Sequence, residues 1–273
     1  VLESAAYGTT GPRAQGAGFD MCFQALCGHD WRGGGPGNMP LWNRTSMVDF
    51  AAGLLGAVGA LQKLYERARS GGGAEVGAGL LNAGLYLMSE LVQRADGQFV
   101  GAPQVNRSQT GFHPAEQFYE AADGWVAIVA RNDAMARALV QVLGIGQALS
   151  APRAAWDEAA ATQIAAAVKS RRCDELIAAL EAAGVWAERC RDDAEATTLF
   201  DAELERLGTI CRTEHPQFGT VRQVGPLVRL SAARPPAPPL PAPLAGEHTD
   251  RILGELGYSA AEIQALRERQ IVK

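Results

Sequence analysis

The stretch that decides the fold is Asp49-Phe50-Ala51-Ala52-Gly53-Leu54-Leu55-Gly56, which opens a helix expected to run to about Arg69. Its first turns are apolar on nearly all sides, and this pattern predicts burial. The following Ser70-Gly71-Gly72-Gly73 ends the helix, because glycine is favoured just past a helix C-terminus. This helix is therefore expected to lie at the centre of a folded unit.

Asp49 stands at the predicted start of that helix, after a glycine-rich stretch (33–38) expected to be a loop. The expected position of Asp49 is partly buried. Unpaired backbone N–H groups and the positive end of the helix dipole should keep its carboxylate ionised there. Position alone favours a helix-capping role over catalysis. An ionised carboxylate is nevertheless the form that a nucleophile needs, so Asp49 is also a candidate catalytic residue.

Composition narrows the classes of function. The chain has 273 residues, of which 47% are apolar and 20% charged, so it can bury a core in one large or two smaller domains. A net charge of −5 gives no electrostatic case for nucleic acid. Four scattered histidines argue against a metal site, and the longest apolar run, inside 50–61, is too short to span a bilayer. Five cysteines without a C-x-x-C pair suit buried thiols in a reducing compartment. A soluble cytoplasmic protein is expected, with neither membrane nor metal.

The remaining pattern alternates strands and helices. A strong hairpin signal, Ala122-Asp123-Gly124, separates strands expected at 117–121 and 125–130, and Asn132 or Asp133 can cap the next helix. Trp125 and Trp186 are expected in a core, and Thr249 should cap a C-terminal helix. Other expected elements are strands at 1–7, 75–80 and 185–187, helices at 20–27, 81–94, 154–169, 173–183, 193–206, 249–256 and 260–269, and an extended proline-rich segment at 235–243.

Several short motifs occur in an order that one family shares. They are Tyr7-Gly8-Thr9-Thr10-Gly11-Pro12, Gly18-Phe19-Asp20 with Gln24-Ala25, Val48-Asp49 with Ala52-Gly53, His113-Pro114, Asp123-Gly124-Trp125-Val126, His215-Pro216, and Leu244 to Tyr258. In this order and spacing the chain resembles the class III CoA-transferases, or CaiB/BaiF family, which includes formyl-CoA transferase, carnitine CoA-transferase and α-methylacyl-CoA racemase.

The resemblance implies an α/β fold. It implies a partial Rossmann-like large-domain portion at 1–100, a small α+β domain at 112–220, and a C-terminal strap and helix at 221–273 that return to the large domain. Members of the family carry a longer segment before the part that resembles Tyr7 to Pro12. The resemblance therefore implies either a missing N-terminal segment or a second chain that supplies it, as in the family's interlaced homodimers.

The resemblance also assigns chemistry. Asp49 matches the aspartate that attacks an acyl-CoA thioester and then carries CoA as an aspartyl-CoA thioester before passing it to a small carboxylic acid. Coenzyme A thioester is the substrate, no cofactor is bound permanently, and no metal is needed. The residues expected to contact the substrate or CoA are Tyr7, Gly8, Phe19, Gln24 and Arg44, although core packing explains Tyr7 equally well and solvated arginine is the default for Arg44.

Two alternatives stay open from the sequence. In the racemase branch the aspartate works with a histidine at the position matched here by Phe19, which cannot exchange a proton, so racemisation would need His29 in that role. A surface loop is the more ordinary place for His29. The chain could also be a non-catalytic family member that binds CoA esters without turnover.

Overall fold

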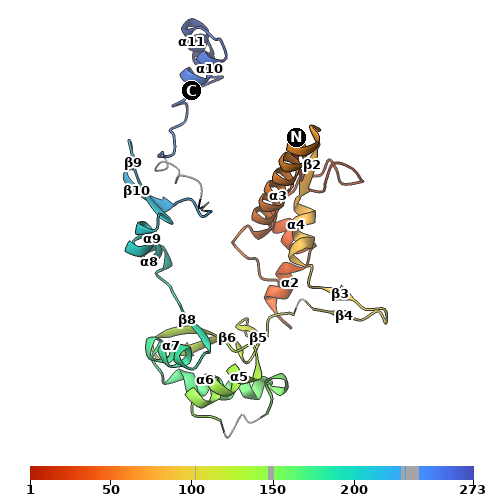
Figure 1. Ribbon diagram of the computed structural model, residues 1–273, viewed down its shortest axis with the longest axis vertical. Helices are drawn as coiled ribbons and strands as arrows, with labels where there is room; N and C mark the ends of the chain where they lie inside the picture. The colour runs from red at the N-terminus through yellow and green to blue at the C-terminus, as the bar shows by residue number, and fades with distance from the viewer. Residues whose placement is uncertain (102, 147–150, 229–230, 232–239) are drawn as a thin grey trace. The chain divides into compact units, whose positions relative to one another are not determined.

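The computed structural model describes residues 1–101, 103–146, 151–228, 231 and 240–273 (Figure 1). The chain divides into two compact units, Val1–Cys190 and Arg191–Lys273, each of which is described by itself. The domain boundaries expected at 100, 112 and 220 stay a prediction.

A parallel pair of strands organises the N-terminal part of the first unit. Strand β1 (Leu2–Ala5) pairs with β2 (Val76–Gly79), with Leu2 opposite Val76. Parallel strands need a long crossover, and here it contains helices α1 (Asp20–Leu26), α2 (His29–Gly34) and α3 (Met47–Ser70). Helix α4 (Leu80–Leu87) follows β2 directly. A small core joins α1, α3 and α4; its buried residues are Phe23, Val48, Ala51, Ala52 and Ala83.

Helix α3 buries only one side. The residues turned into the core are Val48, Ala51, Ala52 and Gly56, whereas Phe50, Leu54, Val58, Leu61 and Tyr65 recur at helical spacing along an exposed face. By length and composition α3 could cross a membrane: its most apolar window has a mean hydropathy of 1.3 and is 22% buried. The expectation that no segment is long enough to span a bilayer was therefore wrong, because the apolar pattern continues beyond 50–61. Composition alone does not separate such a helix from a core helix.

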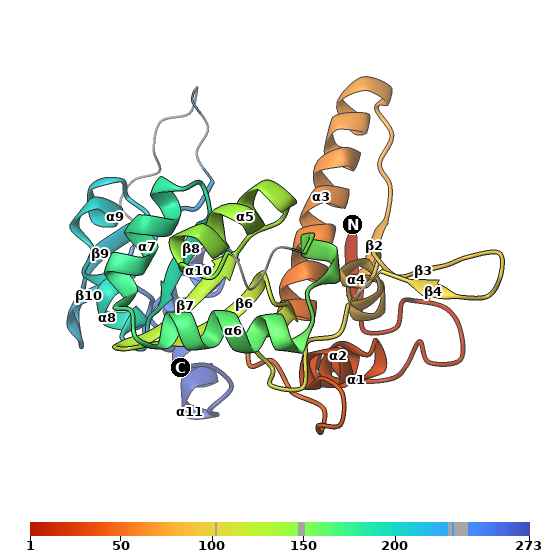
Figure 2. The same ribbon diagram turned by 90° about the horizontal axis from the view of Figure 1, so that it is seen from below.

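The rest of the first unit is built on an antiparallel sheet. Its strands are β5 (Gly111–His113), β6 (Glu116–Ala121), β7 (Gly124–Val129) and β8 (Trp186–Cys190), in that order. Helices α5 (Asp133–Val142), α6 (Glu158–Lys169) and α7 (Cys173–Ala182) lie beside it (Figure 2). Their buried residues Leu139, Ile164 and Leu176 join Val126 and Ile128 of β7 in one core. Three short elements complete the unit: β3 (Val92–Gln93), β4 (Phe99–Val100) and a 3-10 turn at Arg153–Ala155.

The second unit is smaller. Helices α8 (Ala194–Leu199) and α9 (Ala202–Arg206) precede an antiparallel pair, β9 (Ile210–His215) and β10 (Gly219–Val224). Two C-terminal helices follow, α10 (Thr249–Glu255) and α11 (Ala260–Glu268). Ser259 and Glu262 form a reciprocal capping box at the start of α11.

The structure confirms several predicted elements. The hairpin is present as β6 and β7, and the Asn132 side chain caps α5 by accepting the Met135 N–H. Helix α3 is also present, although it begins at Met47 rather than at Asp49. The expected helix at 81–94 ends early, at Leu87. Part of the proline-rich segment, 235–239, lies outside the described residues.

Other predictions were wrong for identifiable reasons. The stretch 33–38 is not all loop, because α2 continues through Gly34. Trp125 and Trp186 are 44% and 60% exposed, since they alternate with core residues and face away from the helices. Thr249 is the first residue of α10 and His248 occupies its N-cap position. Of the five thiols only Cys173 is buried. Strands β9 and β10 were not predicted.

Candidate functional site

The first turn of α3 is capped from outside the helix. Ser46 occupies the N-cap position, but its side chain makes no capping hydrogen bond. Instead, the N–H groups of Val48 and Asp49 donate to Oδ2 of Asp20 on α1, at 2.9 and 3.2 Å. Asp20 therefore satisfies the amides that an N-cap side chain would normally bind.

Asp20 is itself held by buried contacts. Its side chain is 3% exposed, and its Oδ1 accepts a short hydrogen bond from Nε2 of Gln24, one helical turn further along α1. The same Gln24 nitrogen lies 3.2 Å from the carbonyl oxygen of Asn43 and 3.3 Å from that of Thr45. One amide group thus links α1 to the loop that leads into α3.

Asp49 lies on the first turn of α3 with its side chain exposed. Desolvation by neighbouring atoms, followed by the negative charge of Asp20, raises the pKa of the Asp49 carboxyl above its ordinary value. The expectation of a partly buried carboxylate stabilised by helix amides is therefore wrong. The physical reason is that Asp20 occupies the amides of Val48 and Asp49, which leaves Asp49 uncommitted at the surface.

The other predicted contact residues lie around the same two helices. Phe19 is the N-cap residue of α1 and its side chain is 67% exposed. Tyr7 is half-buried, with its ring centroid 4.8 Å from that of Phe23 and the Arg13 guanidinium 5.4 Å above it. Gly8 adopts φ +87°, a left-handed conformation suited to glycine, in the turn that follows β1. Core packing thus accounts for one face of Tyr7.

Arg44 stands in the loop just before α3. It is exposed, and within the described residues its side chain makes no hydrogen bond or ion pair. Because Gln24 binds the carbonyls of Asn43 and Thr45, the backbone on both sides of Arg44 is anchored. The structure therefore brings Gln24, Arg44 and Asp49 to one end of α3.

A pocket of about 410 Å³ opens beside this end of α3. Gln24 is fully buried, lines the pocket and has an Oε1 atom without a hydrogen-bond partner among the described residues. His29 also lines it, and its Nε2 donates to the Gly84 carbonyl at 3.1 Å, because a carbonyl oxygen can only accept. The other lining residues are Arg32, Gly33, Leu41, Asn43, Met47, Leu87, Met88, Glu90, Pro103, Val105 and Phe112.

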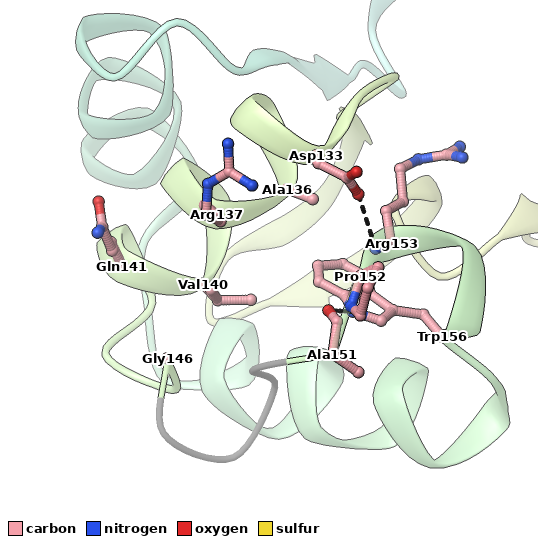
Figure 3. Close-up of a pocket in the computed structure, with 10 residues that line it drawn as sticks. All are labelled: Asp133, Ala136, Arg137, Val140, Gln141, Gly146, Ala151, Pro152, Arg153 and Trp156. Carbon is pink, nitrogen blue, oxygen red and sulfur yellow. Dashed lines mark hydrogen bonds between the residues drawn. The ribbon is translucent and has the colours of Figure 1, made fainter.

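A second pocket, of about 360 Å³, lies between α5 and the 3-10 turn (Figure 3). The Arg153 backbone N–H donates to Asp133 across its rim, and the Trp156 indole N–H donates to the Ala151 carbonyl. None of the residues predicted to act in catalysis or binding lines it. Gln24 lines the pocket at α3, which is therefore the candidate site, although Asp49 is not among its lining residues. Among the described residues, no group of three or more His, Cys, Asp or Glu side chains could hold a metal ion.

Sequence reasoning singled out Asp49 as a candidate, which stays a prediction, but did not predict that two other acidic residues are buried. Asp20 was noted only as part of a motif, and Asp30 was not noted as buried at all. Burial raises the pKa of the Asp30 carboxyl, an effect that the charge of nearby His29 opposes and that of Asp20 reinforces. The sequence did contain one signal for the burial of Asp20: it lies one helical turn before Gln24 on an otherwise apolar segment.

Comparison with known proteins places the chain in a family. The model of CoA-transferase family III matches residues 1–249. The chain therefore belongs to CoA-transferase family III. It is 27% identical, over its whole length, to a succinyl-CoA–D-citramalate CoA-transferase of Chloroflexus aurantiacus, and 24% identical over 92% of its length to human succinyl-CoA:glutarate CoA-transferase. It is also 26% identical over 98% of its length to human α-methylacyl-CoA racemase.

Solved structures agree with this assignment at the level of fold. A CaiB/BaiF family protein from Brucella suis superposes with a TM-score of 0.71 at 24% identity, covering 93% of this chain and 67% of the other. The protein Rv3272 from Mycobacterium tuberculosis gives 0.68 at 19% identity, covering 90% and 66%. The predicted α/β fold class is confirmed. The chain spans 69%, 58% and 69% of the length of the three curated relatives above.

Proposed function

We propose that the protein is an acyl-CoA:carboxylate CoA-transferase with Asp49 as its nucleophile. The observation that carries this proposal is the exposed, uncommitted Asp49 carboxylate on the first turn of α3, in a chain that belongs to CoA-transferase family III. A carboxylate whose capping role has been taken over by another residue is free to attack an electrophile.

The proposed reaction proceeds through balanced acyl transfers. The Asp49 carboxylate attacks the thioester carbonyl, and CoA leaves as a thiolate while a mixed anhydride forms. The thiolate attacks the aspartyl carbonyl, which releases the donor acid and gives an aspartyl-CoA thioester. The acceptor carboxylate then attacks that thioester and expels the thiolate, which attacks the acceptor carbonyl of the new anhydride. Acceptor-CoA leaves and the Asp49 carboxylate is restored.

Four other predicted site residues have proposed roles in binding. The unpartnered Oε1 of Gln24 can accept an N–H or O–H of the substrate, since a buried acceptor favours a donor. The exposed Phe19 and the exposed part of the half-buried Tyr7 offer apolar contact, and the turn at Gly8 allows close backbone approach. CoA itself is a substrate in this proposal, and no permanently bound cofactor is needed.

Succinyl-CoA is the proposed donor class. The names of the two transferases described above both contain succinyl-CoA, and their acceptors, citramalate and glutarate, are dicarboxylic acids. We therefore propose a short dicarboxylic acid as acceptor. We also propose that the protein acts as a cytoplasmic homodimer.

Trapping tests the nucleophile directly. The protein is incubated with succinyl-CoA and hydroxylamine, and the peptide that contains Asp49 is analysed by mass spectrometry. A hydroxamate at Asp49 is expected, because hydroxylamine attacks an anhydride or thioester at that carboxyl. Glu90, the acidic residue among those that line the pocket, is the internal control and should stay unmodified. Release of CoA with an unmodified Asp49 would rule out the mechanism.

Arg44→Ala should weaken binding of the CoA substrate. Its free guanidinium on an anchored loop suits a phosphate, and an exposed charge-assisted contact of about 1–1.4 kcal/mol corresponds to a five- to tenfold rise in KM for succinyl-CoA. The kcat should stay unchanged, since the contact is made equally before and during reaction. Arg67→Ala, an exposed arginine in the last turn of α3, is the matched control and should leave KM unaltered. An equal rise in KM in both variants would show that Arg44 does not bind the CoA substrate.

Racemisation is the second candidate, because human α-methylacyl-CoA racemase is among the relatives. Phe19 cannot act as a base, and His29 uses Nε2 to bind the Gly84 carbonyl, which leaves only Nδ1 for proton transfer. Loss of α-deuterium from a 2-methylacyl-CoA would support racemisation. Binding of CoA esters with neither reaction would support a non-catalytic member of the family.

A further inference from the structure

The start of α3 depends on a residue that the proposed chemistry does not use. Helices usually begin with a side chain that caps their own first amides, but Ser46 makes no such bond. The capping hydrogen bonds are instead accepted by Asp20 of α1, which precedes Val48 by 28 residues and Asp49 by 29. The backbone amide of the proposed nucleophile is therefore bonded to a different helix.

We propose that Asp20 is a positioning residue for Asp49, because its buried carboxylate fixes the turn of backbone that carries the nucleophile. This inference rests on the proposed function of Asp49. The positioning effect follows from burial, because Asp20 and Gln24 have almost no exposed surface. Gln24 donates a short hydrogen bond to Asp20 and also binds the carbonyls of Asn43 and Thr45, so it connects the cap to the loop before α3. A turn held on both sides places a reacting group with little reorganisation.

The charge of Asp20 adds an electrostatic part. The charged or titratable side chains on the elements packed against α3 are Glu3 on β1, Asp20 and Cys22 on α1, and Tyr86 on α4, while β2 carries none. After desolvation, the cause that raises the pKa of Asp49 is the charge of Asp20. A more basic carboxylate is the stronger nucleophile, so the same residue orients Asp49 and keeps it reactive.

The test compares two carboxylate caps. Asp20→Asn keeps an oxygen acceptor but removes the charge next to Asp49. Asp157→Asn makes the same change in the cap of α6, where Asp157 accepts the N–H groups of Ala159 and Ala160 at 3.0 and 3.3 Å. The readouts are the titration midpoint of the Asp49 carboxyl, followed by carbon NMR, and kcat for transfer from succinyl-CoA.

The expected result separates the two caps. Asp20→Asn should move the Asp49 midpoint to lower pH and reduce kcat by about ten- to a hundredfold, the loss typical of a misplaced group. Asp157→Asn should leave both unchanged. The inference would be overturned if Asp20→Asn changed neither the titration midpoint of Asp49 nor kcat. The NMR titration does not depend on turnover, so it remains decisive even if the protein proves not to be a transferase.

A second measurement uses only the unaltered protein, so it remains possible if Asp20→Asn fails to fold. In the unaltered protein, the amide protons of Val48 and Asp49 should exchange slowly with solvent, although amides of a first helical turn are normally unprotected. The Arg44 and Ser46 amides, just outside the helix, donate no hydrogen bond within the described residues and serve as references. Exchange of the Val48 and Asp49 protons as fast as that of the references would equally overturn the role of Asp20.

Discussion

Asp49→Asn is expected to reduce CoA transfer by at least about a thousandfold. Removal of a nucleophile abolishes the covalent route, and residual turnover then comes only from binding and electrostatic stabilisation. The amide has almost the same shape, and the side chain is exposed, so the free energy of unfolding should change by no more than about 0.5 kcal/mol. The measurements are kcat with succinyl-CoA and glutarate, and urea unfolding followed by circular dichroism.

Two controls define what this loss means. Asp49→Glu keeps the carboxylate but displaces it by one methylene, so it should retain trace activity above that of the asparagine variant. Asp133→Asn changes an exposed acidic residue in the first turn of α5 and should be fully active. Full transfer activity in Asp49→Asn would contradict the assignment of the nucleophile.

Phe23→Ala is expected to destabilise the N-terminal part of the chain by about 3–5 kcal/mol. The Phe23 side chain is completely buried, and its ring lies tilted against that of Tyr7 with the centroids 4.8 Å apart. Packing around it is tight: a Cβ added to Gly18 would come within 2.7 Å of the Phe23 ring. The core around it includes the small residues Ala51, Ala52 and Ala83, which cannot fill the space left by the ring, so much of the cavity cost should remain. Urea unfolding monitored by circular dichroism measures the change.

Phe19→Ala is the matched control, since it removes the same ring four residues earlier on a side chain that is 67% exposed. Its free energy of unfolding should stay within about 0.5 kcal/mol of that of the unaltered protein. A similar loss of stability in both variants would show that the core assigned to α1 and α3 is not the stabilising one.

Local sequence patterns predicted the elements whose signals are self-contained. The hairpin at 122–124 and the cap at Asn132 depend on residues that are neighbours in the chain, so the structure could be anticipated there. Trp125 and Trp186 were placed wrongly because a strand has two faces, and only the position of the covering helices decides which face is buried.

The candidate site was predictable only in part. The family motif identified the position of Asp49, but dipole arguments assigned the amides of α3 to the wrong carboxylate. Asp20 lies 29 residues from Asp49, and a contact of that range leaves no trace in the periodicity of either helix. The pairing of Gln24 with the loop around Arg44 is of the same kind, since it appears only when α1 and the start of α3 are adjacent.

The parallel pairing of β1 with β2 has a kinetic consequence. Strands β6 and β7 are joined by a two-residue turn and can pair in microseconds, whereas Leu2 of β1 must meet Val76 of β2 across the whole helical crossover between them. Closing such a long loop costs chain entropy before any contact offsets it. We therefore expect the antiparallel sheet to fold first, and β1 to join β2 late in folding.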